Sequence, residues 1–213
     1  MLFHPYSWKN SLTFILNQPF DATEAHLEMA PYRKIGYDSS KKPIYSAVGI
    51  HLFFDGEPTL ILIERPQTMR KHAGQIAFPG GKKDEGDRDL IETALRESHE
   101  EIGINPENLK AIGSLSPVYI PVSNYLVQSF AFTHNEKPKM LLNPDEVNLI
   151  LEVKISEILS RYSISNTDIQ LQNGIKIKSA RCFHIQNKII WGATAILLNE
   201  LKHRIIQFHQ TTV

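Results

Sequence analysis

The chain has 213 residues, of which 42% are hydrophobic, and this is enough for one sizeable packed core. Lys and Arg together number 23 and so do Asp and Glu, so no overall charge recruits nucleic acid or an anionic membrane. Cys182 is the single cysteine, which excludes an intramolecular disulfide and a thiolate metal cluster and predicts a small buried residue in a reducing compartment.

The N-terminal region lacks the basic and apolar segments of a secretion signal, and no apolar run in the chain approaches the ~20 residues that span a bilayer. We therefore expect a cytoplasmic protein. Residues 7–32 mix apolar groups with turn formers, which predicts two short helices, the second within Ala22–Met29. We treat residues 1–44 as an extension packed on a main domain, residues 45–213.

The main domain begins with two runs rich in Ile, Val, Leu and Phe, Tyr45–Phe54 and Leu60–Arg65. The turn-forming sequence Asp55-Gly56-Glu57-Pro58 separates them, so they are predicted to form a hairpin of largely buried strands. A polar loop over residues 66–75 follows and leads to Ile76-Ala77-Phe78.

A helix is predicted over Asp89–Ile102. Asp89 and Glu92 have the spacing of a capping box, and Gly103 followed by Pro106 ends the helix. Later segments are predicted to be strands, and Asn173-Gly174 is a hairpin turn between two more. The predicted strands are Leu109–Val122, Tyr125–His134 and Glu146–Val153.

The last predicted helix, Trp191–Phe208, is apolar on most of its circumference, which favours core packing. A contact in a homodimer is the alternative interpretation of the same pattern.

The helix over Asp89–Ile102 separates into two faces at 100° per residue. One face is apolar and is predicted to dock on a sheet, and the other is acidic and is predicted to face solvent. The apolar face carries Ile91, Ala94, Leu95, Ser98 and Ile102, and the acidic face carries Glu97, Glu100 and Glu101.

The spacing of the glutamates indicates a bound cation. Glu97 and Glu101 are neighbours four residues apart, where like charges repel by a few tenths of a kcal/mol. Mg²⁺ and Mn²⁺ prefer carboxylate oxygens and often complete their ligand shell with phosphate, so a diphosphate substrate suits such a site. The alternative, for an acidic run considered by itself, is a solvated helix face.

The context of these glutamates resembles the Nudix box. Gly80-Gly81 is followed by a loop and then by the predicted helix, whose second half and end read Arg96-Glu97-Ser98-His99-Glu100-Glu101-Ile102-Gly103-Ile104. Two positions depart from the pattern. Asp87 stands where a glutamate is usual, with one extra residue before Arg96, expected in the loop before the helix, which makes the role of Asp87 doubtful. Ser98 replaces an apolar residue and is small enough to lie against a sheet.

The segment before the box resembles the signature of the coenzyme A pyrophosphatase branch of the Nudix family. An apolar strand ends at Arg65, and Arg70, Gly74 and Phe78-Pro79-Gly80-Gly81 follow at the expected spacings. The departures are Ile63 in place of Thr and Pro66 in place of Ser or Ala. Two later segments, residues 143–147 and 190–194, also look like parts of this branch.

Coenzyme A carries a 3′-phosphate beside its diphosphate, and Arg side chains are suited to phosphate oxygens. Arg65 and Arg70 are therefore candidate substrate-binding residues, with a salt bridge or a loop anchor as the alternative role for each. Gly80 and Gly81 are candidates as well, because glycine allows a close approach of backbone that a Cβ would prevent.

The resemblance implies an α+β protein, a Nudix-type α/β/α sandwich with a mixed β-sheet on which the box helix packs. It implies Glu97, Glu100 and Glu101 as catalytic residues and ligands of Mg²⁺ or Mn²⁺, with Arg96 as a further catalytic residue. The general base stays open among these glutamates and an acid of a later loop. Asp145 or Glu146 is such an acid.

The implied reaction is the metal-dependent hydrolysis of coenzyme A or its derivatives to 4′-phosphopantetheine and adenosine 3′,5′-bisphosphate. One alternative is a Nudix hydrolase of another small-molecule nucleoside diphosphate derivative, such as ADP-ribose, NADH or a dinucleoside polyphosphate. A second is a Nudix-like binding module without catalysis. We expect no nucleic-acid or membrane partner, because the basic residues form no long stripe with interleaved aromatics.

Overall fold

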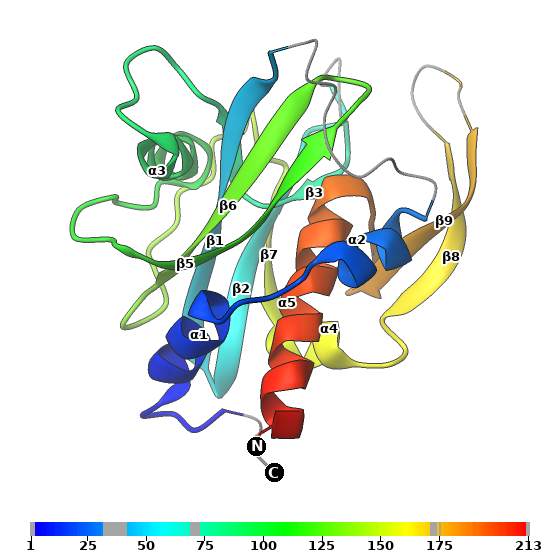
Figure 1. Ribbon diagram of the computed structural model, residues 1–213. Helices are drawn as coiled ribbons and strands as arrows, with labels where there is room; N and C mark the ends of the chain where they lie inside the picture. Colours follow the sequence, from blue (N-terminus) through cyan, green and yellow to red (C-terminus); the bar gives the residue numbers. More distant parts are fainter. Residues whose placement is uncertain (1–2, 32–41, 69–72, 171–173, 175, 212–213) are drawn as a thin grey trace.

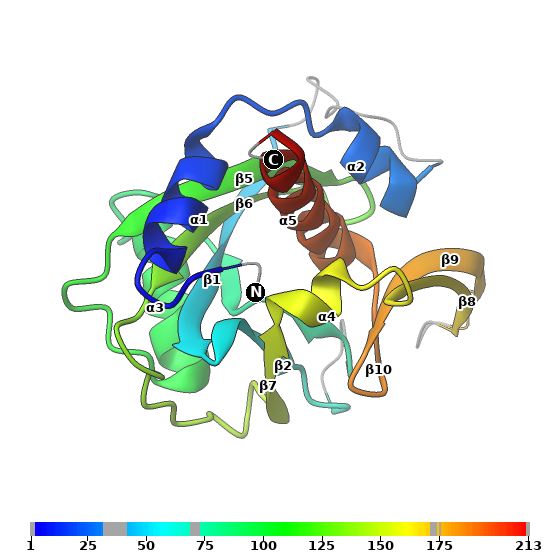
Figure 2. The same cartoon turned by 90° about the horizontal axis from the view of Figure 1, so that it is seen from below.

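A mixed β-sheet lies in the middle of the computed structural model, with α3 on one face and α1 and α5 on the other (Figures 1 and 2). The structure describes residues 3–31, 42–68, 73–170, 174 and 176–211. The helices are α1 (Trp8–Asn17), α2 (Thr23–Met29), α3 (Leu90–Ile102), α4 (Ile155–Leu159) and α5 (Gly192–Thr211). The strands are β1 (Ile44–Asp55), β2 (Glu57–Glu64), β3 (Ile76–Ala77), β4 (Gly80–Lys82), β5 (Ala111–Ile120), β6 (Tyr125–Thr133), β7 (Leu149–Lys154), β8 (Ile164–Gln170), β9 (Lys176–Ile185) and β10 (Lys188–Ile190).

The order of strands in the main sheet explains why it is mixed. The predicted hairpin of β1 and β2 is antiparallel, β1 pairs with β6 in parallel, and β5 and β7 add antiparallel strands to β6 and β2. The short consecutive strands β3 and β4 pair with β2 and β1 respectively. The chain between residues 76 and 82 therefore crosses from one central strand to the other, which places Gly80 beside the middle of the sheet.

A second, antiparallel sheet is formed by β8, β9 and β10, and we name it the accessory sheet. It lies on the opposite side of the molecule from α3 (Figure 1). Its hairpin of β9 and β10 contacts the main sheet, because Nε2 of Gln186 donates to the carbonyl oxygen of Glu152 in β7 at 2.8 Å. The predicted turn residue Asn173 lies outside the described residues, whereas Gly174 has a φ of 84°.

The helix α5 supplies much of the core, which confirms core packing as the reason for its apolar circumference. Its buried apolar residues are Ala195, Ile196, Leu197, Leu198, Leu201 and Ile205. A homodimer stays a prediction. Cys182 is buried, as predicted. No helix in the described ranges is both long enough and apolar enough to cross a membrane.

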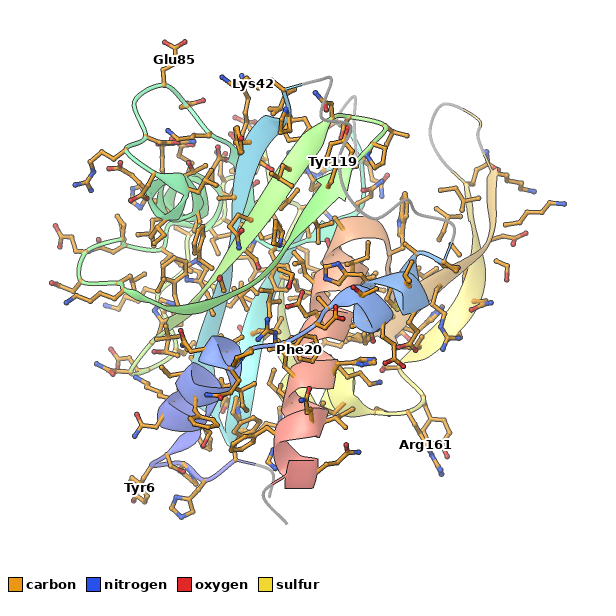
Figure 3. All side chains as sticks on the ribbon, viewed as in Figure 1. Tyr6, Phe20, Lys42, Glu85, Tyr119 and Arg161 are labelled. Carbon is orange, nitrogen blue, oxygen red and sulfur yellow. The ribbon has the colours of Figure 1, made fainter. Side chains whose placement is uncertain are left out.

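The N-terminal helices pack on this core through buried apolar residues and through α5. Nη1 of Arg204 donates to the carbonyl oxygens of Leu16 and Gln18, and its guanidinium lies 4.6 Å from the ring of Phe20, which Figure 3 labels between α1 and α2. Nε2 of His26 lies 2.8 Å from Oε2 of Glu200. Residues 3–29 thus contribute to the core, while the division at residue 45 into extension and domain stays a prediction.

Candidate active site

Both ends of α3 are fixed by local sequence. The carboxylate of Asp89 accepts from the backbone N–H of Glu92 at 2.9 Å and caps the helix, as predicted. The carboxylate of Glu92 accepts from the N–H of Arg88, one residue before the expected partner of a capping box. Gly103, at φ 69°, takes the left-handed conformation that ends the helix, and its N–H donates to His99. The first and last residues of α3 are therefore fixed, and with them the direction in which each acidic side chain leaves the helix.

The extra residue of the box falls between Asp87 and Arg96, and a loop precedes the regular helix α3 in this region. Residues 83–88 form this loop, and Glu85 points away from the body of the protein (Figure 3). Gly86 is also exposed, and a Cβ there would meet nothing within 4 Å. The extra residue leaves α3 itself regular.

Ser98 lies against the sheet with no exposed surface, which confirms its predicted place on the apolar face. Its Oγ donates to the carbonyl oxygen of Ala94 at 2.6 Å and lies 2.9 Å from Nε2 of His51 in β1. Nδ1 of His51 lies 3.1 Å from Nε2 of His134. Because the Ser98 hydroxyl has one proton, His51 donates from Nε2 and accepts at Nδ1 from His134. A serine at this position gives the buried His51 a hydrogen-bond partner, which an apolar residue would not.

Glu101 is only 1% exposed, so the prediction that it faces solvent is wrong. Its Oε2 accepts from the N–H of Gly80 at 2.9 Å, and its Oε1 accepts from Nη1 of Arg65 at 3.2 Å. Gly80 belongs to β4 and Arg65 follows β2, so the splayed ends of the sheet cover this side of α3. Helical periodicity cannot reveal a cover made by residues distant in sequence.

Burial raises the pKa of Glu101 to about 8. The negative charges of Glu97 and Glu146 add to the increase, and the Gly80 N–H and the Arg65 guanidinium oppose it. Burial also raises the pKa of Glu97, and the charges of Glu100 and Glu146 act in the same direction. Burial and the neighbouring carboxylates thus both disfavour the ionised forms of Glu97 and Glu101.

Glu97 and Glu100 both form an ion pair with the guanidinium of Arg96. Nη1 of Arg96 lies 2.9 Å from Oε1 of Glu97 and 2.9 Å from Oε2 of Glu100. The Glu97 side chain is 15% exposed and that of Glu100 is 48% exposed. The carboxylate of Glu97 lies directly under Gly81, where a Cβ would be 2.4 Å from its Cδ. A side chain at position 81 would therefore displace the carboxylate of Glu97 from this place.

Asp87, whose role was doubtful from the spacing, anchors Arg96. Nε and Nη2 of Arg96 donate to the two oxygens of Asp87 at 3.0 and 3.1 Å. Asp87 also accepts from the N–H of Asp84 and the hydroxyl of Thr93. The hydrogen bonds from Arg96 are the main reason that the pKa of Asp87 falls to about 2. Arg96 therefore lies between a fixed aspartate and the glutamates Glu97 and Glu100.

Glu146 is the later acid that lies near the site, because the turn that carries it begins at Asn143, whose N–H donates to the carbonyl oxygen of Glu101 at 3.0 Å. Its charge adds to the raised pKa values of Glu97 and Glu101. It lies in a tight turn, residues 143–147, which we name the acid turn. The N–H groups of Glu146 and Val147 donate to the carbonyl oxygen of Asn143. Glu146 is half-buried and Asp145 is exposed, a distinction that the sequence left open.

The two candidate arginines are placed differently. Arg70 lies outside the described residues, so its role stays a prediction. The Arg65 side chain is 22% exposed, and its Nε is buried without a hydrogen-bond partner among the described residues. The backbone of Arg65 connects the two ends of the loop that follows it. Its N–H donates to the carbonyl oxygen of Gln75, and its carbonyl oxygen accepts from the N–H of Gly74.

The acidic side chains suit a hard divalent cation by their chemistry. In the described part of the chain, no three His, Cys, Asp or Glu side chains already converge as metal ligands, since Arg96 and Arg65 occupy some of the glutamate oxygens. Burial is the main reason that the pKa values of Glu97 and Glu101 are raised, and neighbouring carboxylates add to the increase. Carboxylate oxygens are the ligands that Mg²⁺ and Mn²⁺ prefer.

Comparisons with known proteins agree with this geometry. A family model described as the NUDIX domain matches residues 44–163. The chain belongs to the Nudix hydrolase family. It is a pyrophosphatase-type hydrolase that acts on a diphosphate substrate, in a family that generally uses divalent metals.

Two relatives carry the name uncharacterized Nudix hydrolase NudL. The protein of Photorhabdus laumondii is 33% identical over 84% of this chain and 92% of its own length. The protein of Pectobacterium atrosepticum is 35% identical over 78% of this chain and 87% of its own length.

Solved Nudix structures share the fold. The MutT protein of Methanosarcina mazei aligns with a TM-score of 0.50 at 20% identity, over 80% of this chain and 98% of its own. A Nudix hydrolase of Nitrosomonas europaea aligns with a TM-score of 0.51 at 13% identity, over 84% of this chain and 78% of its own. The predicted α+β class with a mixed sheet and the box helix packed on it is thereby confirmed for this Nudix hydrolase.

Proposed function

We propose that this Nudix hydrolase cleaves the diphosphate bond of coenzyme A or its derivatives, giving 4′-phosphopantetheine and adenosine 3′,5′-bisphosphate. The observation that carries the proposal is the contact of Arg65 with Glu101. Arg65 ends the strand of the segment that resembles the coenzyme A pyrophosphatase signature, and Glu101 belongs to the Nudix box. The two sequence patterns therefore describe one site.

Glu97, Glu100 and Glu101 are the proposed ligands of Mg²⁺ or Mn²⁺. The cation, when bound, supplies positive charge to the diphosphate and makes a water molecule more acidic. Arg96 orients Glu97 and Glu100 through a guanidinium that Asp87 holds from the other side. Gly80 orients Glu101 through its backbone N–H.

Glu146 is the proposed fourth acid of the site. It is half-buried, and its charge acts on Glu97 and Glu101. A carboxylate can accept a proton from an attacking water. Glu146 and the box glutamates are thus the groups that can accept this proton.

Arg65 and Arg70 are the proposed phosphate-binding residues. Arg65 is partly exposed and has donor capacity beyond its contact with Glu101, because a guanidinium carries five N–H donors. A phosphate oxygen can accept from the remaining donors. The 3′-phosphate of coenzyme A provides a second anionic group for Arg70.

Product analysis by mass spectrometry tests this function. The purified protein is incubated with coenzyme A, dephospho-coenzyme A, ADP-ribose and NADH, each with Mn²⁺ and with chelator. We expect metal-dependent release of 4′-phosphopantetheine from coenzyme A and much slower cleavage of dephospho-coenzyme A. Preferred cleavage of ADP-ribose or NADH would retain the diphosphate chemistry and contradict the substrate.

A further inference from the structure

The accessory sheet is joined to the catalytic end of the main sheet by an ion pair. Nζ of Lys188, in β10, lies 2.8 Å from Oε2 of Glu64. Glu64 is the last residue of β2, directly before Arg65, and its side chain is 10% exposed. A carboxylate this deeply buried requires a partner, because an unpaired buried charge is strongly destabilising. Lys188 supplies that partner from a distant part of the sequence.

Glu64 in turn holds the end of the acid turn. Its carbonyl oxygen accepts from the N–H of Asn148 at 2.7 Å, and its Oε2 accepts from Nδ2 of Asn148 at 3.3 Å. Asn148 directly follows the acid turn. The start of the turn is held by α3, because the N–H of Asn143 donates to the carbonyl oxygen of Glu101 at 3.0 Å. The turn that carries Glu146 is thus attached at both ends.

We propose that Lys188 is a positioning residue for the active site, which acts through Glu64 and Asn148 to hold Glu146 beside Glu97 and Glu101. The inference rests on the proposed role of Glu146 as the fourth acid. Val147, next to Glu146, is fully buried in a cluster with apolar residues of β2 and α3, which also holds the turn in place. Loss of the Lys188 ammonium leaves the Glu64 carboxylate uncompensated and loosens the attachment of Asn148.

The test compares Lys188→Met, Lys188→Arg and a control, Lys178→Met, which changes an exposed lysine of the same sheet. Hydrogen exchange measured by mass spectrometry reports on residues 143–149 without substrate. We expect faster exchange of this segment in Lys188→Met, and parental exchange in Lys188→Arg and Lys178→Met. Unchanged exchange in Lys188→Met would overturn the proposal, whatever substrate the parental protein cleaves.

Steady-state kinetics distinguish a positioning role of Lys188 from a general loss of structure. We expect Lys188→Met to lower kcat about tenfold with a change in KM of less than about twofold, as misplacement of a reacting group does. Lys188→Arg should recover most of the loss. In a Glu146→Gln background the same substitution should have little further effect, because both changes act on one group. Losses that multiply in the double variant would contradict the proposal.

A parental protein that cleaves no diphosphate would overturn the proposed function. The exchange of residues 143–149 would in that case still decide whether Lys188 holds the acid turn.

Discussion

Arg96 and Asp87 form a two-fold contact in which Nε and Nη2 of the arginine each donate to one oxygen of the aspartate, at 3.0 and 3.1 Å. Such paired hydrogen bonds fix the plane of a guanidinium. Nη1 is thereby aimed at Glu97 and Glu100. Asp87 is nine residues before Arg96, yet it determines where two candidate metal ligands lie.

Replacing Asp87 by Asn should lower both stability and turnover. Asn retains one acceptor oxygen for Arg96, Thr93 and Asp84, whereas Asp87 offers two. We expect a loss of about 1–3 kcal/mol of unfolding free energy, from a buried network left partly unsatisfied, and a fall of about tenfold in kcat. Denaturant unfolding and steady-state kinetics measure these.

A control for Asp87→Asn is Glu92→Gln, which removes an exposed ion pair with Arg88 in the same region. It should leave both the unfolding free energy and kcat near the parental values, because exposed pairs contribute little. Equal effects of the two substitutions would contradict the anchoring role of Asp87.

Substituting Gly81 by Ala should impair metal binding with little effect on folding. The added Cβ would lie 2.4 Å from the carboxylate of Glu97, which is the movable end of a flexible side chain. We expect Mn²⁺ affinity to fall about tenfold or more, measured by calorimetric titration. Gly86→Ala is the matched control because its Cβ would meet nothing within 4 Å. An unchanged affinity in Gly81→Ala would count against Glu97 as a ligand.

Replacing Glu101 by Gln should reduce turnover by about a hundredfold or more, because a charged metal ligand is lost. We expect the protein to remain folded, since Gln keeps the shape of the side chain and one acceptor oxygen for Gly80 or Arg65. Circular dichroism checks the fold, and product formation at saturating Mn²⁺ checks turnover. Near-parental turnover would remove Glu101 from the proposed metal site.

The metal-free protein should become less stable as pH rises from about 5 to above 8. The folded pKa of Glu101, about 8, lies above its ordinary value of 4.5, so the folded state binds more protons than the unfolded state within this window. Its contribution to stability is complete below the unfolded pKa and is lost as pH rises through the folded one. Thermal unfolding with chelator, at pH 5.5, 7 and 8.5, measures the trend.

Comparison with Glu101→Gln isolates this titration from that of other groups. The variant should show a flatter dependence of Tm on pH, and Mn²⁺ should restore the stability of the parental protein most strongly at pH 8.5. The same slope in both proteins would show that another group causes the trend.

The buried histidines should have the opposite effect at acidic pH. Burial, with the charge of His134, lowers the pKa of His51 to about 3, and burial, with the charge of Lys9, lowers that of His134 to about 4. Since the ordinary value is 6.5, the unfolded state takes up protons first, and stability falls as pH decreases below about 6.5. The loss continues down to the folded pKa values.

Denaturant unfolding at pH 7.5 and pH 5 checks this expectation. His134→Gln keeps a donor for His51 but cannot titrate, so it should lose less stability between the two pH values than the parental protein. An equal loss would assign the acid sensitivity to other groups.

The sequence predicts the elements whose signal is local. The apolar runs of β1 and β2 and the capping residue Asp89 each act within a few neighbours, and the structure has these elements within a few residues of their predicted bounds. The short strands β3 and β4 have no such signal, because two or three residues carry no periodicity. They form because the β1–β2 pair splays and leaves unpaired backbone on both strands.

The candidate site is predictable to a similar extent. Glu97, Glu100 and Glu101 are brought to one helix surface, as their spacing requires. The burial of Glu101 and the approach of Glu146 are not predictable from spacing, since Gly80, Arg65 and residue 146 reach α3 only through the sheet topology. The role of Asp87 could be predicted from the sequence by searching for an acid near Arg96 that pairs with it, in addition to the glutamates of the box.

The segment matched by the family model, residues 44–163, ends before β8, β9, β10 and α5 and begins after α1 and α2. A protein cut to those limits would lose Leu201, Ile205 and the other α5 residues that cover one face of the sheet. It would also lose Lys188 and leave the Glu64 carboxylate unpaired. The segment that the family model matches is therefore smaller than the part of the chain whose side chains build the core and pair with Glu64.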